Sequence, residues 1–139
     1  MRNVATFLCA IALLGGAAVS TGCGGGSSYS VIGTPRAPDA DGQVSLEGIE
    51  GGNRLVKIQL QHVPPPSRLG PGLTVYVVWF TANGQAPVKA GLLAFDEGSR
   101  KGNLVATTPL RNFQLRITAE RAQDVASPGE TTILERQIQ

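Results

Sequence analysis

Residues 73–80 read L-T-V-Y-V-V-W-F, a run in which only Thr74 is polar. A short segment that is apolar on both faces and rich in β-branched and aromatic residues is typical of a central strand, buried on both sides. The connection that follows, Thr81–Gln85, has Asn-Gly at its tip, which favours a tight hairpin. We therefore expect residues 87–95 to return antiparallel, with Gly91 marking a bulge or a close approach of backbone.

Alternating apolar and polar residues predict two further strands, each with one solvated face. In F-Q-L-R-I-T-A-E, residues 113–120, every second side chain is apolar, and residues 55–63 alternate in the same way. Shorter strands are expected at 43–47, 104–107 and 131–138. Glycine and proline separate these segments at intervals of about 10–15 residues, which is typical of an all-β sandwich. We predict a single antiparallel Ig-like β-sandwich of about seven strands over residues 42–139.

The N-terminus has the layout of a secretory signal peptide. Arg2 precedes an uncharged apolar run, Val4–Val19, which is shorter than the roughly 20 residues that a membrane-spanning helix needs. Small residues follow, and Ser20-Thr21-Gly22-Cys23 resembles a bacterial lipobox, in which the cysteine is acylated and becomes the new N-terminus. We predict a signal peptide over residues 1–22 and lipidation of Cys23.

An ordinary signal-peptidase site is the alternative. Ala18-Val19-Ser20 fits the small-x-small rule, and Ser20 stands where a lipobox usually has an aliphatic residue. Cleavage there leaves Cys23 as a free thiol on a secreted protein. Cys9 is lost with the signal peptide under either alternative, so an unmodified Cys23 would be unpaired and open to oxidation, which favours lipidation.

Residues 23–41 are expected to form a flexible tether, because they combine G-G-G-S-S with prolines, glycines and aspartates and have no periodicity. The chain carries 12 Lys and Arg against 10 Asp and Glu, with the signs interspersed. This balance predicts neither a nucleic-acid partner nor a polybasic membrane patch. The acidic pairs are interpreted as solvated turn and linker charges rather than calcium ligands. They are Asp39 with Asp41, and Asp96 with Glu97.

Few side chains offer catalytic or metal chemistry. His62 is the only histidine and stands just before three prolines. A catalytic role would need a nucleophile and an orienting acid beside it, and zinc would need a cluster of Cys or His ligands. Tyr76 and Trp79 are interpreted as core residues rather than a platform for a sugar or peptide. We predict no catalytic residue, no metal and no cofactor.

The region from Leu73 onward resembles the extracytoplasmic C-terminal domain of anti-sigma-K-type regulators. Those domains are β-sandwiches in which a Tyr-x-x-Trp strand precedes a hairpin, an Ala-Gly step and a strand ending near Thr-x-Glu. The matching positions are Tyr76, Trp79, Ala90, Gly91, Thr118 and Glu120. The sigma-binding domain and the transmembrane helix of those regulators are not found in this sequence, and residues 123–129 replace a Gly-Gly-Ser/Thr-Pro segment. The resemblance therefore implies the fold and not sigma-factor binding.

These observations predict a non-enzymatic lipoprotein of the bacterial cell envelope, held to the membrane by lipid on Cys23. Gly24 in place of aspartate after that cysteine favours the outer membrane, and secretion is the alternative. The sandwich is expected to be an interaction or structural module for another envelope protein or a surface polymer, met through loop 63–72 or a strand edge. The alternative functions are a sensory or regulatory component related to anti-sigma domains and an envelope hydrolase using His62.

Overall fold

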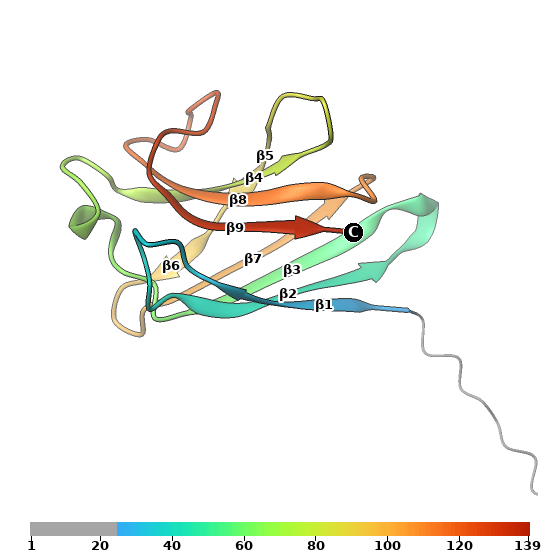
Figure 1. Cartoon of the computed structure of the whole chain (residues 1–139), viewed down its shortest axis with the longest axis horizontal. Coiled ribbons are helices and arrows are strands. Elements are labelled where there is room, and N and C mark those ends of the chain that lie inside the picture. Colours follow the sequence, from blue (N-terminus) through green and yellow to red (C-terminus); the bar gives the residue numbers. More distant parts are fainter. Residues whose placement is uncertain (1–24) are drawn as a thin grey trace, which may run out of the picture.

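The structure is a computed structural model that describes residues 25–139 (Figure 1). The expected signal peptide and Cys23 lie outside the described residues. Two short 3-10 helices, Glu50–Gly52 and Pro66–Arg68, accompany the strands. No helix in the described part of the chain is long and apolar enough to cross a membrane. The strands are β1 (Ser27–Ile32), β2 (Asp41–Gly48), β3 (Arg54–Gln61), β4 (Val75–Thr81), β5 (Val88–Leu92), β6 (Ala94–Asp96), β7 (Lys101–Thr108), β8 (Phe113–Glu120) and β9 (Thr132–Ile138).

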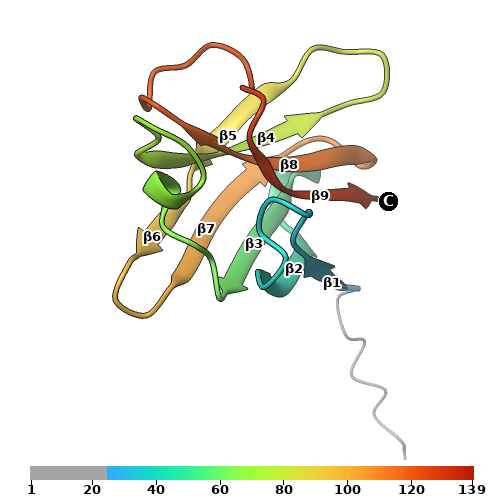
Figure 2. The same cartoon turned by 60° about the vertical axis from the view of Figure 1, so that its left-hand side comes forward.

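The strands form two antiparallel sheets that pack face to face (Figures 1 and 2). One sheet has the order β1-β2-β3-β7-β6 and the other β5-β4-β8-β9. The predicted all-β antiparallel sandwich is confirmed, with nine strands among the described residues rather than about seven.

The core lies between the sheets and follows the period-two patterns of the sequence. On β3 the inward side chains are Val56, Ile58 and Leu60, none more than 2% exposed. On β8 the apolar half of the alternation faces the core in the same way. Burial of one such side chain stabilises the fold by about 1.5–3 kcal/mol. The two alternating segments thus supply facing layers of one core.

Strand β1 lies inside the segment expected to be a tether. Residues 27–32 pair with β2 in a regular antiparallel register, and Val31 is 4% exposed in the core. The following loop docks on β9, because Thr34 donates its N–H to the Ile133 oxygen (2.8 Å) and its hydroxyl to the Thr132 oxygen (2.7 Å). The expected boundary at residue 42 is therefore corrected: the folded domain includes Ser27, and only residues 24–26 separate Cys23 from β1.

The segment expected as one returning strand, residues 87–95, is divided between the sheets. β5 pairs with β4, and β6 pairs with β7 in the other sheet. Leu93, which is 6% exposed, makes the crossing and donates its N–H to the Tyr76 oxygen at 3.0 Å. The expected bulge is confirmed, since Val78 faces Gly91 and Trp79 faces Lys89, so that Ala90 is the extra residue.

Candidate functional site

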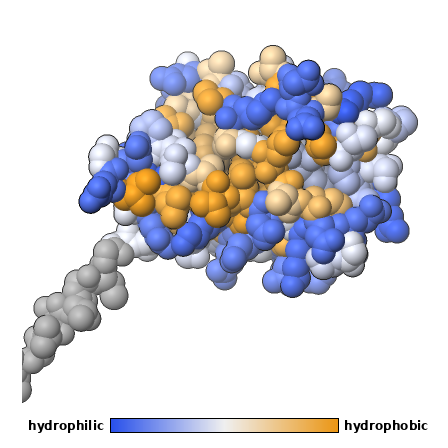
Figure 3. Space-filling view, turned by 180° about the vertical axis from the view of Figure 1, so that it is seen from behind, coloured by the Kyte–Doolittle hydropathy of each residue, from blue (hydrophilic) through white to orange (hydrophobic). Residues whose placement is uncertain are grey.

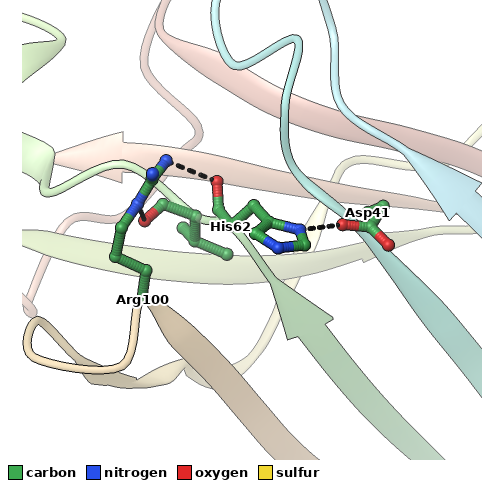
Figure 4. Close-up of polar contacts among 4 residues, drawn as sticks. Asp41, His62 and Arg100 are labelled. Atoms are coloured by element: carbon green, nitrogen blue, oxygen red, sulfur yellow. Dashed lines mark hydrogen bonds and ion pairs between the residues drawn. The ribbon is translucent and has the colours of Figure 1, made fainter.

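His62 and Arg100 meet at the end of the sandwich where β3 ends and β7 begins (Figure 4). His62 Nδ1 lies 2.6 Å from an Asp41 carboxylate oxygen. Arg100 donates through Nη2 to the His62 carbonyl (2.9 Å) and through Nε to the Val63 carbonyl (3.2 Å), and its own carbonyl accepts the Val63 N–H. These contacts fix the chain as it leaves β3.

The arrangement around His62 is better suited to holding the chain than to catalysis. A histidine that contacts a carboxylate supplies two members of a catalytic triad, the base and the orienting acid. The third member is a nucleophile, a hydroxyl or thiol that is hydrogen-bonded to the imidazole ring. No hydroxyl or thiol among residues 25–139 hydrogen-bonds to His62, and these residues contain no group of three or more metal-ligating side chains. The hydrolase alternative therefore has an orienting acid, Asp41, but no hydroxyl or thiol bonded to His62 within residues 25–139.

A buried polar network lies on the outer face of the second sheet. The Trp79 ring N–H donates to the Thr118 hydroxyl (2.9 Å), which donates to Glu120 Oε1 (2.6 Å). The same carboxylate oxygen accepts the N–H of Gly129 at 2.7 Å. Glu120 is 7% exposed, and no ion pair to it occurs within the described residues. Trp79, Thr118 and Glu120 are thus joined as one structural unit.

The connection between β8 and β9, residues 121–131, is held close to this outer face. Figure 2 shows it rising from the second sheet on the side away from β2 and β3. The Gly129 bond to Glu120 and a bond from Lys89 Nζ to the Gln123 oxygen (2.7 Å) hold the connection in place. Tyr76 faces the inner core and Trp79 the outer face, and each is 1% exposed. The prediction that both aromatic residues are buried is confirmed.

One side of the sandwich is closed and the opposite side is open. On the closed side the β1–β2 loop bridges to β9, and the Tyr29 hydroxyl donates to the Gln139 carbonyl at 2.5 Å. On the open side β5 pairs only with β4, and β6 pairs with β7 only over residues 101–103. β5 and residues 104–108 of β7 therefore each have an edge without a partner strand in the described part of the chain.

An apolar groove of about 250 Å³ lies on this open side. Its walls include Phe80, Val88 and Ala90 from the β4–β5 hairpin and Leu110 from the chain after β7. Val88 is 63% exposed, and Leu92 and Val105 nearby on β5 and β7 are also exposed. Figure 3 shows the side opposite to the view of Figure 1, where apolar side chains form a band across the surface. The groove is the candidate functional site.

The edge of β5 is partly protected against strand addition. It is five residues long and bulged at Ala90, and both features limit pairing with another strand. Lys89, which could guard the edge by its charge, instead lies over the Trp79 ring, 5.9 Å from its centroid. We therefore expect contact through side chains in the groove rather than through an extended backbone ladder.

The other acidic residues singled out in the sequence occupy turns. Asp39 is exposed in the β1–β2 loop, and Asp96 and Glu97 are exposed at the β6–β7 turn. The Ser99 hydroxyl and then the Gly98 N–H, both donating to Asp96, lower the pKa of that carboxyl. Asp41 is the exception, because it begins β2 and holds His62. No sequence pattern predicts that contact, because it arises from the β2–β3 register, which places Asp41 opposite Gln61, the neighbour of His62.

Comparison of the chain with protein-family models, with curated proteins and with solved structures gave no match.

Proposed function

We propose that this protein is a non-enzymatic, lipid-anchored lipoprotein of the bacterial cell envelope whose β-sandwich binds a partner protein on its open side. The anchor is supported by the lipobox-like sequence ending at Cys23. Binding is supported by one observation above all: the apolar groove between the β4–β5 hairpin and the chain after β7, with Val88 exposed at its rim. Apolar side chains gathered at an exposed groove are typical of protein contact surfaces.

The groove favours a protein partner over a charged or nucleic-acid ligand. Its one charged residue is Lys89, whose ammonium group is already bonded to the Gln123 carbonyl. A partner is expected to place apolar side chains against Phe80, Val88 and Leu110. Each such side chain, if fully buried, would contribute about 1.5–3 kcal/mol.

The anchor is tested by intact mass spectrometry of the protein from its native membrane fraction, beside a Cys23→Ala variant. We expect a mature chain that begins at Cys23 and carries added acyl mass, and we expect the variant to lose both features. A soluble chain that begins near Thr21 with an unmodified thiol would contradict the anchor and favour secretion.

The binding surface is tested by photo-crosslinking in native cells. A photoreactive residue at Val88 is compared with one at Gln59, an exposed position on the outer face of the other sheet. We expect a discrete protein adduct from position 88 that position 59 does not give. The same adducts from both positions, or none from position 88, would argue against the groove.

A further inference from the structure

The structure places the folded domain very close to Cys23. β1 begins at Ser27, four residues after the cysteine, and Ser27 pairs with Leu46, two residues before the end of β2. Four residues of fully extended chain span at most about 14 Å. If Cys23 carries lipid, as proposed above, the end of the sandwich that holds Ser27 cannot move far from the membrane surface.

The surface at this end is built from turns and the C-terminal strand. Gly25 lies in one hollow with Ile49 and Asn53 of the β2–β3 turn, with Arg54, and with Arg111 and Asn112 before β8. A neighbouring hollow shares Asn112 and is lined largely by amide side chains, among them Asn83, Gln85 and Gln114. Figure 1 shows the start of β1, the β2–β3 turn and the C-terminus together at one end of the molecule.

The chemistry of this end fits a layer of lipid headgroups. Arg54 donates to the Arg111 carbonyl at 2.6 Å, which brings two basic residues side by side, and neither forms an ion pair within residues 25–139. Arginine binds phosphate strongly through charge-assisted hydrogen bonds. Ile49 is an apolar side chain, 39% exposed, in a turn with the acidic Glu50 and two glycines.

We propose that the Gly25 end of the sandwich lies against the membrane that holds Cys23, with Arg54 and Arg111 contacting lipid phosphates. This inference rests on the proposed lipidation of Cys23. It sets the orientation of the domain: the β6–β7 turn, at the opposite end in Figure 1, points away from the membrane.

Hydrogen exchange of the native lipoprotein in vesicles of phosphatidylethanolamine and phosphatidylglycerol tests the proposal. The control carries an insertion of about twelve Gly and Ser residues between Gly24 and Gly25, which adds roughly 20 Å of reach. We expect slower exchange at residues 49–53 and 109–112 in the native protein than in the control, and equal exchange at residues 96–101. Equal exchange at all three segments would overturn the proposal.

The phosphate contact is tested by the double variant Arg54→Glu/Arg111→Glu. Arg68→Glu is the matched control, because Arg68 is exposed in the short helix after β3. We expect the double variant to lose the vesicle-dependent protection and Arg68→Glu to keep it; retained protection in the double variant would overturn the contact. The mass measurement separates the two proposals, since a chain without acyl groups refutes the anchor, whereas an acylated chain without protection refutes only this orientation.

Discussion

His62 and Arg100 are the two non-glycine residues of the described chain with left-handed backbone, at φ of 55° and 56°. This conformation costs a residue other than glycine roughly 1–2 kcal/mol, so something must hold it. The guanidinium bonds from Arg100 to the carbonyls of His62 and Val63 do so. The two strained residues therefore stabilise one another where the chain leaves β3.

Substitutions at Arg100 separate the strain from the bonds. Arg100→Ala loses the guanidinium and keeps the unfavourable φ, so we expect a loss of about 1–2 kcal/mol in the free energy of unfolding. Arg100→Gly loses the same bonds but relieves the φ, and it should be more stable than the alanine variant by about 1 kcal/mol. Urea denaturation measures both, with Arg68→Ala as control. An alanine variant as stable as the glycine variant would contradict this account of the strain.

Tyr76 makes stability depend on pH in the alkaline range. Burial raises the pKa of its hydroxyl above the ordinary value near 10, and the hydroxyl donates to the Pro64 carbonyl. The unfolded chain thus releases this proton at lower pH than the folded chain. The buried hydroxyl makes its full contribution to the free energy of unfolding below pH 10. As the pH rises further this contribution falls, by at most about 1.4 kcal/mol per pH unit. We therefore expect the difference in urea unfolding midpoint between wild type and Tyr76→Phe to shrink from pH 8 to pH 10 and pH 11. A difference that stays constant over this range would show that the pH dependence does not come from Tyr76.

At the scale of elements, the 121–131 connection and β4 depend on each other. β4 is buried on both faces, as its apolar sequence predicts, and the connection over its outer face is held by the Gly129 bond to Glu120 and the Lys89 bond to the Gln123 carbonyl. Glu120→Ala leaves the Thr118 hydroxyl and the Gly129 N–H without their acceptor, which costs about 1–3 kcal/mol for each buried group left unsatisfied. Glu120→Gln keeps an oxygen in place and should lose less.

Trp79 reports this change directly, because it is the single tryptophan of the protein and donates into the same network. We expect native Glu120→Ala to show red-shifted emission and stronger acrylamide quenching, and Glu120→Gln to remain close to wild type. Unchanged quenching in native Glu120→Ala would mean that the connection stays closed without its carboxylate.

Strands were predictable from the sequence where the apolar and polar residues of the segment alternate regularly along its whole length. Residues 113–120 form β8 as expected, because their alternation is regular and each apolar side chain finds the core. β6 was not predicted as a separate strand, because it has only three residues and forms by pairing with β7. β1 was not predicted either, because its first residues continue the Gly/Ser-rich segment that was interpreted as a tether. The groove was not predictable either, since Phe80, Val88 and Leu110 are brought together by the crossing of the chain between sheets. These features depend on contacts between segments that are distant in the sequence, which a local pattern of residues does not show.

At the scale of the whole molecule, β1 decides how far the domain stands from Cys23, and truncation tests its place in the fold. A chain starting at Gly25 keeps β1 and should match a chain starting at Cys23 in stability. A chain starting at Gly33 lacks β1. It therefore loses the pairing between β1 and β2, the buried Val31 and the Tyr29 bond to Gln139. We expect it to lose about 2–4 kcal/mol, with burial of Val31 alone worth about 1.5–3 kcal/mol. If residues 23–41 were a tether, both truncations would leave the free energy of unfolding unchanged. Urea denaturation of the two chains therefore distinguishes a domain that begins within a few residues of Cys23 from one joined to Cys23 by a long flexible segment.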